Sequence, residues 1–311
     1  MICKFAPIVL FTFKRPEHTR RTMLSLAQNA DFLNSPLFIY CDGARHADES
    51  AQVEELRQLV NDWPHPNKSV IMRERNWGLA NSVIDGVTVQ CDTFGKVIVV
   101  EDDMVVSPHF LNFMNTALDK YQHDDRVISI HGYSYPIDSL PAAFFIKGPG
   151  CWGWATWKRG WDLFEADGQK IYDELQRKKL MYRFNMLGSY PYKQMLHDQI
   201  HGLNDSWAIR WYASALLRDK LTLHPGISLV SNIGLDGSGT HCGSEVVKAF
   251  TFSTACPEIN VEVKESEYAL DLWSRYLKKF RREKLFRILT STNLLTTVAK
   301  RALNRFLKKH C

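Results

Sequence analysis

The sequence predicts an α/β protein in which a mainly parallel sheet is flanked by helices and followed by a C-terminal helical tail. Two observations predict this fold class. Short apolar runs alternate with stretches of helical apolar spacing over the first 121 residues. In addition, an acidic triplet directly follows the run of residues 97–100, the position at which open α/β sheets place their ligands. The length of 311 residues suits one large domain with a smaller appendage, and a hydrophobic content of 45% provides a substantial core.

The N-terminal part of the chain is expected to contain four strands joined by three helices. The expected strands are residues 7–13, 37–41, 69–72 and 97–100, and the expected helices are residues 17–29, 50–63 and 79–91. Crossover connections between parallel strands are right-handed and usually helical, so this alternation predicts a mainly parallel sheet.

We expect the fold to be organised around residues 96–111, which read KVIVVEDDMVVSPHFL. An unbroken β-branched run suits a strand covered on both faces, and the acids Glu101, Asp102 and Asp103 follow it at once. Adjacent carboxylates that lose hydration require a positive partner. A divalent ion that carries a diphosphate meets this need, and oxygen ligands suit magnesium or manganese. The alternative is a solvated acidic turn after a core strand.

Two further signals flank this stretch. Ser107 and Pro108 predict the start of a helix that continues to about residue 121. After the first strand, Lys14-Arg15-Pro16 stands where a dinucleotide-binding protein would carry GxGxxG, which argues against a classical NAD site. A basic residue such as Arg15 can meet phosphates there, although a solvated surface cation would have the same sequence.

The second half of the chain changes in character. Strands are expected at residues 127–130 and 144–146, followed by GPGCWGWATWKRGW at residues 148–161. Glycine allows a backbone to approach a ligand closely and indole offers a flat apolar surface, so this segment suits a sugar ring. The alternative is a tryptophan-rich corner of the core. Residues 162–203 are expected to be helical and polar.

Two later segments carry candidate chemistry. Asp205 lies in Asn204-Asp205-Ser206-Trp207, an apparent helix start at which an acid usually serves as a cap. Residues 231–241 read SNIGLDGSGTH, a glycine-rich polar loop that ends in His241. Loops of this kind serve as lids or phosphate cradles as well as connectors.

Taken together, these segments resemble the glycosyltransferases of the Rossmann-like GT-A fold. The resemblance is to the N-acetylglucosaminyltransferase I type and to bacterial sugar transferases of polysaccharide loci. It covers about residues 5–245 and depends on VVEDDMVVSPHFLNFM, GPGCWGWATW, NDSWAIRW and SNIGLDGSGTH. It implies a catalytic domain at residues 1–265, with a nucleotide-binding half (1–121) and an acceptor-binding half (122–265), before a tail at residues 266–311.

The resemblance implies a metal-dependent, inverting transfer of a sugar from a nucleotide-sugar, expected to be UDP-linked. In such enzymes the last acid of the triplet ligates manganese, which makes Asp103 the metal ligand here. Asp102 would lie near the ribose or the metal, and Glu101 would face the donor sugar in the catalytic centre. Arg15 would contact phosphate, and Asp42 would hydrogen-bond the base.

The remaining implied roles concern the donor sugar and the acceptor. Trp154 and His241 would complete the donor site, and Asp205 would be the base that deprotonates a saccharide or lipid-linked saccharide acceptor during surface polysaccharide synthesis. This chain lacks the tighter acidic-acidic-Trp arrangement of the animal enzymes, so Asp198 is the reserve candidate for the base.

Two other functions remain open at the level of the sequence. The first is a nucleotidyltransferase, but the first turn, FTFKRPEHT, has no glycine, whereas those enzymes usually carry a glycine-rich loop there. The second is a non-catalytic, membrane-associated module that binds carbohydrate through the tryptophan-rich segment. That function leaves the acidic triplet without a role.

The positive charge of the chain is concentrated near its end. Residues 273–311 contain 12 Lys and Arg and one acid, whereas residues 1–272 contain 27 basic and 33 acidic side chains. From Leu294 onward the apolar residues recur on one helical face, a pattern that favours docking on an anionic membrane surface. The alternative is a helical pair packed on the catalytic domain.

The same composition sets the expected location and partners. Seven scattered cysteines without a CxxC pair fit a reducing compartment, and the sequence contains no run of 18 apolar residues. We expect a cytoplasmic protein without a signal peptide, peripheral at the inner face of the cell membrane, and no nucleic-acid partner.

Overall fold

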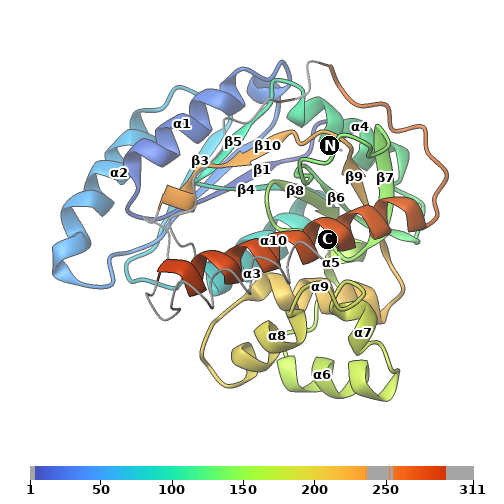
Figure 1. Ribbon diagram of the computed structural model, residues 1–311. Helices are drawn as coiled ribbons and strands as arrows, with labels where there is room; N and C mark the ends of the chain where they lie inside the picture. Colours follow the sequence, from blue (N-terminus) through green and yellow to red (C-terminus); the bar gives the residue numbers. More distant parts are fainter. Residues whose placement is uncertain (1–3, 237–251, 253–254, 292–311) are drawn as a thin grey trace.

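The computed structural model describes residues 4–236, 252 and 255–291, and it confirms the expected α/β class (Figure 1). Within this part of the chain, eight strands form one mostly parallel sheet in the order β3-β2-β1-β4-β8-β6-β9-β7. Their bounds are β1 Ile8–Thr12, β2 Leu37–Cys41, β3 Lys68–Met72, β4 Lys96–Glu101, β6 Val127–His131, β7 Ala143–Lys147, β8 Trp154–Trp157 and β9 Leu221–Pro225. Two short strands, β5 Met104–Val106 and β10 Val230–Asn232, pair separately as an antiparallel ribbon.

Helices cover the sheet and form a group of their own at one end of the molecule (Figure 1). The helices of the described residues are α1 Pro16–Ala27, α2 Ser50–Asp62, α3 Leu79–Phe94, α4 Phe110–Lys120, α5 Lys158–Trp161, α6 Gly168–Arg177, α7 Met181–Phe184, α8 Tyr192–Ile200, α9 Trp207–Leu217 and α10 Glu267–Ser291. Three 3₁₀ turns add η1 Phe32–Asn34, η2 Ala47–Glu49 and η3 Gly234–Asp236. Helices α6 to α9 share a separate apolar cluster, which explains why they gather away from the sheet.

The parallel half of the sheet positions the site. Strand β1 lies between β2 and β4 and is parallel to both, with Ile8 opposite Leu37 on one side and Ile98 on the other. The connection through α1 leads to β2, whereas the connection through α3 leads from β3 across to β4 on the other side of β1. The strand order therefore reverses between β1 and β4, and the crevice at the carboxyl ends of these strands is the position favoured for ligands.

The tryptophan-rich segment differs from expectation, because four of its residues form β8 in the middle of the sheet. Strand β8 pairs antiparallel with β4 and β6, and the side chain of Trp154 is fully buried. The Trp154 ring centroid lies 5.4 Å from that of Trp207, 5.8 Å from Trp161 and 6.0 Å from Trp211. The prediction that Trp154 binds the donor is therefore corrected, since a ring enclosed by other indoles has no face left for a sugar.

The predicted start of α4 is also corrected. The helix begins at Phe110, while Ser107 and Pro108 precede it in a turn in which the Ser107 hydroxyl accepts from His109 N at 3.2 Å. The residues just before this turn form β5, which pairs with β10 about 125 positions later in the chain. This pairing extends the chain past the acidic triplet and delays the helix.

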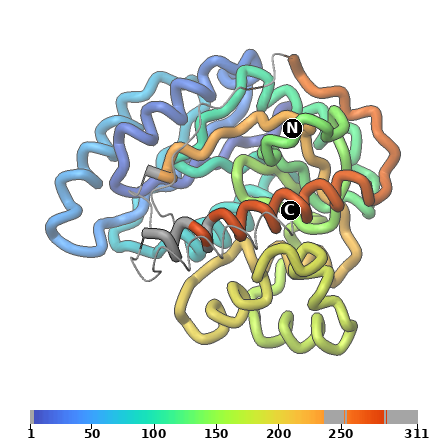
Figure 2. The backbone as a smooth tube through the Cα atoms, in the orientation of Figure 1, coloured from blue at the N-terminus to red at the C-terminus, as the bar shows by residue number. Residues whose placement is uncertain are grey.

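Helix α10 packs on the body of the protein. Figure 2 shows the chain descending from residue 255 along the side of the sheet toward this helix, and along this path Tyr121 Oη donates to Ile259 O at 2.7 Å. Trp273 and Leu277 of α10 are buried against Phe144 and Ile146 of β7. For this part of the tail, the structure shows packing on the sheet. Trp273 is therefore part of the core, and membrane docking of the tail stays a prediction.

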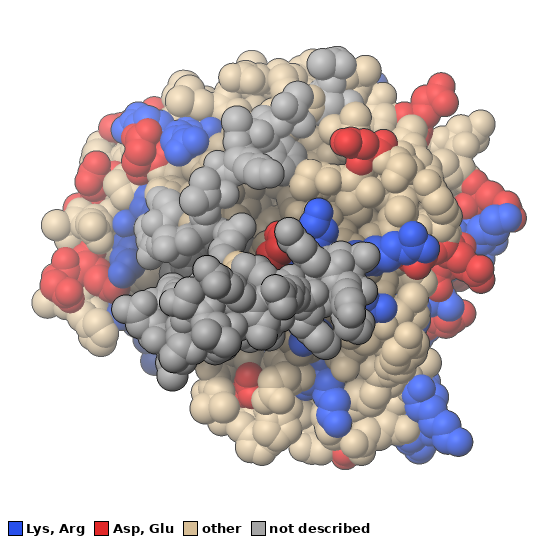
Figure 3. Space-filling view, viewed as in Figure 1, with Lys and Arg blue, Asp and Glu red and all other residues tan. Residues whose placement is uncertain are grey.

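Two further observations bear on membranes. Figure 3 shows Lys and Arg side chains interspersed with Asp and Glu over the described part of the face that α10 crosses. Among the described residues, no helix combines the length and the apolar character needed to cross a bilayer. The segment from Leu294, on which the docking prediction depends, lies outside the described residues.

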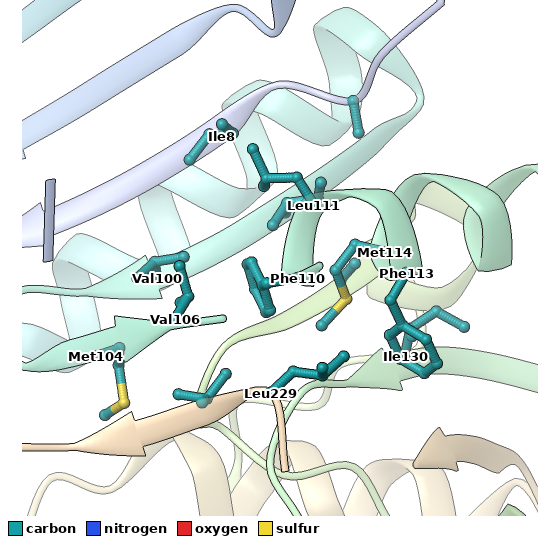
Figure 4. Close-up of a cluster of buried hydrophobic side chains, with 14 of the residues drawn as sticks. Ile8, Val100, Met104, Val106, Phe110, Leu111, Phe113, Met114, Ile130 and Leu229 are labelled. Carbon is teal, nitrogen blue, oxygen red and sulfur yellow. The ribbon is translucent and has the colours of Figure 1, made fainter. Parts of the chain in front are cut away.

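The largest apolar cluster of the described residues includes the strands on both sides of the acidic turn (Figure 4). Phe110 of α4 is fully buried between strands, with Val100 of β4 and Val106 of β5 on one side and Leu229 on the other. Burial of side chains of this size contributes about 1.5–3 kcal/mol each. The cluster fixes β4 and β5 relative to each other, and the acidic turn that joins them is therefore held on a rigid support.

Candidate active site

The site is built where β1 and β4 end. Phe11 of β1 pairs with Glu101 of β4, so the residues that follow each strand leave the sheet side by side. The turn after β1 carries Arg15, and the turn after β4 carries Asp102 and Asp103, both buried. The register of two parallel strands thus brings together residues almost 90 positions apart.

Arg15 is the positive partner that the acids require. Its Nη2 donates to Asp102 Oδ1 and, at 2.9 Å, to Asp103 Oδ2, while its Nε lies 3.3 Å from Asp102 Oδ2. Burial lowers the pKa of Arg15, but the two carboxylates outweigh this effect and raise it above its ordinary value. A guanidinium in this position is permanently charged and is shared between both acids.

Asp102 fastens the two turns to each other. Its Oδ2 accepts from Phe13 N at 3.1 Å, and its backbone carbonyl accepts from the Thr22 hydroxyl of α1 at 2.8 Å. Burial raises the pKa of Asp102; Arg15 opposes this rise and Asp103 adds to it. With both of its carboxylate oxygens bonded to the first turn, Asp102 has a structural role in this arrangement.

Asp103 is less completely bonded. Its Oδ1 is buried and has no hydrogen-bond partner among the described residues, whereas its backbone carbonyl accepts from Ile233 N at 2.8 Å. A Cβ placed on Gly234 would lie 2.1 Å from Asp103 Oδ2, so only glycine allows the chain after β10 to lie this close. The first part of the glycine-rich loop therefore covers the acidic turn.

Glu101, the last residue of β4, is half-buried at the same edge. Burial, followed by the charges of Asp103 and Asp102, raises its pKa well above the ordinary value. A raised pKa favours the protonated carboxyl, and a protonated carboxyl can donate a hydrogen bond to a hydroxyl or a phosphate oxygen. The predicted position of Glu101 toward a donor sugar is compatible with this state.

The donor set fits a divalent ion that is held partly by its own ligand. The described residues contain no group of three His, Cys, Asp or Glu side chains converging on one point. Asp103 nevertheless presents a buried carboxylate oxygen without a partner, and buried polar atoms of this kind require one. Magnesium-type ions are commonly bound by one or two carboxylates together with substrate phosphates, which is the arrangement that this site can supply.

Asp42, after β2, is committed to the backbone. Its Oδ1 accepts from Gly43 N at 3.0 Å and from Trp77 N at 2.8 Å, and its Oδ2 accepts from Gly78 N at 2.9 Å. These bonds hold the turn that leads into α3. The predicted contact between Asp42 and a base remains a prediction, and the role that the structure shows is to position this turn.

Asp205 reaches the same edge of the sheet. A Cβ placed on Gly78 would lie 3.7 Å from Asp205 Oδ2, so this carboxylate adjoins the turn that Asp42 holds. The cap of α9 is Ser206, whose hydroxyl accepts from Ile209 N at 3.3 Å, and the capping alternative for Asp205 is therefore not the one observed. The reserve candidate, Asp198, lies on α8 and accepts from Gln194 at 2.8 Å.

An open groove of about 630 Å³ lies beside the turn that Asp42 holds. Trp77 forms part of its lining, and the guanidinium of Arg73 stacks 3.7 Å from the centre of the Trp77 ring while forming an ion pair with Asp85. The groove continues along α3 past Asn81. Aromatic and amide groups in an open, wet groove are suited to a polar ligand.

Trp152 is less buried than Trp154. It is half-buried and packs edge-on against Tyr133, with ring centroids 4.7 Å apart. Its backbone N–H donates to His131 Nε2 at 3.3 Å, and His131 Nδ1 lies 3.2 Å from His224 Nδ1. This chain of bonds ties the loop before β8 to strands β6 and β9.

Sequence reasoning missed three contributors to the site. The sequence indicates Gly234 only as part of a glycine-rich loop, although its close approach to Asp103 shapes the site. Trp77 carried no signal apart from its proximity to Gly78. Thr22, on the buried face of α1, resembles any core threonine. His241, the remaining predicted site residue, lies outside the described residues.

No family model matches the chain, and no curated protein does. Parts of the chain are similar to solved glycosyltransferase structures. A mannosyltransferase from Pyrobaculum calidifontis, in complex with GDP-mannose and Mn²⁺, is 10% identical over 43% of this chain and 36% of that chain, with a TM-score of 0.32. TarS residues 1–349 from S. aureus are 13% identical over 50% and 47%, with a TM-score of 0.34. Glucosyl-3-phosphoglycerate synthase from Mycobacterium tuberculosis, with Mn²⁺, UDP and phosphoglyceric acid, is 10% identical over 56% and 64%, with a TM-score of 0.34.

The chain therefore spans less than two thirds of the length of each of these three proteins. The TM-scores are all below 0.5, so we assign no role to any residue of this chain from these structures. The strand order and the register of β1 and β4 are what define the architecture of this chain.

Proposed function

We propose that this protein is an inverting, metal-dependent glycosyltransferase that moves a sugar from a nucleotide-sugar, UDP-linked, to a saccharide or lipid-linked saccharide. The observation that carries the proposal is the acidic turn at the point where the strand order reverses, with a buried oxygen of Asp103 that lacks a partner among the described residues. Such crevices hold nucleotides in open α/β sheets, and this oxygen is suited to a hard cation. Surface polysaccharide synthesis is the setting that we propose for the reaction.

Different residues around the turn would bind different parts of the donor. Arg15 would bind the diphosphate, Asp103 would hold manganese or magnesium, and Glu101 would hydrogen-bond the donor sugar. When bound, a divalent ion supplies positive charge against the negative charge that grows on the departing diphosphate. The described part of the glycine-rich loop, including Gly234, lies against Asp103 and would help to exclude water.

Asp205 is the proposed base. It adjoins the turn before α3, beside the groove that Trp77 lines, and we propose this groove as the acceptor surface. A carboxylate within hydrogen-bond reach of the acceptor hydroxyl can take its proton as the new glycosidic bond forms. Attack from the face opposite the diphosphate inverts the anomeric centre and requires no nucleophile from the protein.

The decisive experiment incubates the full chain with a panel of nucleotide-sugars and manganese. We expect one UDP-sugar to raise the thermal unfolding midpoint and to be hydrolysed slowly to UDP in the absence of acceptor. A nucleotidyltransferase would instead release pyrophosphate from a nucleoside triphosphate and a sugar phosphate, and a carbohydrate-binding module would bind glycans without turnover. Either of these results would overturn the proposal.

A pair of variants tests the base. With the donor identified, Asp205→Asn should retain donor binding and lower turnover by roughly 10²- to 10⁴-fold, because the proton has no acceptor. Asp198→Asn is the matched control and should change turnover little. The opposite pattern would transfer the role of base to Asp198.

A further inference from the structure

The contact between Arg15 and the acidic turn bears on how metal and nucleotide bind together, and this inference rests on the proposed function. The residue before it, Lys14, has φ = 41°, a left-handed conformation that is uncommon outside glycine. This sharp turn at the end of β1 places Arg15 at the start of α1, with its guanidinium directed back toward Asp102 and Asp103. The Lys14 side chain is itself anchored, because its Nζ lies 2.6 Å from Glu49 Oε1.

Two atoms of opposite character are left without partners in this cluster. Asp103 Oδ1 is a buried acceptor and Arg15 Nη1 is a buried donor, and neither has a hydrogen-bond partner among the described residues. Their carriers are already joined, since Arg15 Nη2 donates to Asp103 Oδ2 at 2.9 Å. Buried donors and acceptors of this kind are rarely left unpaired, and this pair of atoms suits a cation together with an anion.

A bare metal ion satisfies only one of these two atoms. It would give Asp103 Oδ1 a partner, but it would also place two positive charges close to the guanidinium, and this repulsion is strong in a partly buried site. A diphosphate with its metal ion satisfies both atoms, because its oxygens can accept from Arg15 Nη1 while the ion meets the carboxylate. The anion also screens the cations from each other.

We propose that Arg15 is a built-in counter-ion that makes metal binding depend on the diphosphate. In the free protein, Arg15 neutralises the acids and keeps affinity for a divalent ion low. A nucleoside diphosphate engages Arg15 and restores that affinity, so that metal and nucleotide bind cooperatively. Coupling between two ligands of this kind typically amounts to about 5- to 150-fold in affinity.

The test measures Mn²⁺ affinity of the full chain, from the electron paramagnetic resonance signal of the unbound ion, without nucleotide and with UDP or GDP. We expect Arg15→Met to bind Mn²⁺ alone at least about tenfold more tightly than the wild type, and to lose most of the tightening that the nucleotide causes. Arg20→Met is the matched control, since Arg20 is an exposed arginine on the same helix, and it should behave as the wild type.

Three further variants test this interpretation. Arg15→Lys retains the charge and should leave Mn²⁺ binding weak in the absence of nucleotide, whereas Arg15→Gln should behave as Arg15→Met if the methionine variant does not fold. Adding Asp103→Asn to Arg15→Met should remove the gain in affinity, which locates the gained ion at this site.

If loss of the Arg15 charge leaves the affinity for Mn²⁺ alone unchanged or lower, the inference is overturned. If neither UDP nor GDP tightens Mn²⁺ binding in the wild type, the proposed coupling and the proposed donor both fail, whereas an unchanged affinity of Arg15→Met for Mn²⁺ alone overturns the inference and leaves the donor untouched.

Discussion

Asp102 and Asp103 are neighbours in the same turn, and their hydrogen bonds show that they have different roles. Both carboxylate oxygens of Asp102 are bonded to the first turn, so this residue holds β1 and β4 together. Asp103 keeps a buried oxygen without a partner among the described residues. The sequence places both acids at the end of one strand, but only the structure shows which of them remains available to a ligand.

Substitution of these two acids should therefore have different effects. Asp102→Asn should lower the free energy of unfolding by about 3–5 kcal/mol, because both oxygens of this buried carboxylate are bonded, to Arg15 and to Phe13 N, whereas Asp103 has one bonded oxygen. Asp103→Asn should change stability much less and should abolish metal-dependent turnover. Chemical denaturation and a turnover assay on each variant provide the two measurements, with the exposed Asp119→Asn as control. Equal loss of stability in both variants would contradict this division of roles.

At the scale of the element, local pattern and long-range pairing contribute differently to what the sequence can predict. Strands β1 to β4 were predicted because each is a short apolar run between helical segments. Strand β8 was not, because its four residues, WATW, form a very short run with two tryptophans around two smaller side chains within a glycine-rich segment. The ribbon of β5 and β10 forms only through pairing of distant residues, and three-residue strands leave almost no local signal.

The same limits apply to the candidate site. Its acidic turn and Arg15 could be predicted, since both follow predicted strands, and Asp42 was placed correctly at the end of β2. The role of Asp42 depends on backbone donors of Trp77 and Gly78, which no local pattern reveals. Trp154 was misassigned because composition shows that indoles are present but does not show which face of a strand they occupy.

The two tryptophans near the start of β8 allow a direct test of their separate roles. Trp154→Ala should lower the free energy of unfolding by about 3–5 kcal/mol, since it leaves a large cavity among other indoles. Trp152→Ala should cost less stability and, if this half-buried ring faces a substrate, should raise the KM for donor or acceptor with less effect on kcat. Thermal denaturation and steady-state kinetics distinguish these outcomes. A stable Trp154→Ala variant with impaired sugar binding would restore the original assignment.

At the scale of the whole molecule, a buried histidine pair joins two strands and couples stability to pH. The backbone N–H of Trp152 can only donate, so His131 Nε2 accepts and His131 Nδ1 donates to His224 Nδ1. Burial lowers the pKa of His131 to about 3, and burial, with a smaller effect of His131, lowers the pKa of His224 well below its ordinary value. The pair packs among Tyr133, Phe144, Trp152 and Trp273, of which only Tyr133 titrates, and burial raises the pKa of Tyr133 above its ordinary value.

A depressed histidine pKa stabilises the folded state above pH 6.5, and this contribution is lost as the pH falls below that value, because only the unfolded chain takes up the protons. Together, His131 and His224 should make the free energy of unfolding about 3 kcal/mol lower at pH 5.5 than at pH 7.5. Denaturant titrations at both pH values measure this change. His224→Phe should remove about half of the pH dependence, whereas His197→Asn, at an exposed position, should leave it unchanged; a wild-type slope in His224→Phe would be evidence against the pair.

The basic end of the chain remains the feature with which the whole molecule would meet a membrane. Removal of everything after residue 266 is a poor test, because Trp273 and Leu277 of α10 are buried against β7 and their loss would expose the core. Truncation after Ser291 leaves this packing intact. It removes the segment whose apolar residues recur on one face and whose cations are Lys300, Arg301, Arg305, Lys308 and Lys309.

We predict that the full chain co-sediments with anionic vesicles at low salt and that the chain ending at Ser291 does not. Each basic residue near an anionic surface contributes about 1 kcal/mol, so replacing Lys300, Arg301, Arg305 and Lys308 with glutamine should weaken binding by up to roughly 10³-fold. Replacing the exposed Lys170 and Arg177 of α6, together with two other exposed basic residues of the body, gives a matched loss of charge and should have little effect.

Neutral vesicles should bind all variants weakly, and raised salt should weaken binding of the full chain because the attraction is screened. Equal binding by the full and truncated chains, or binding by neither, would leave the segment without a membrane role.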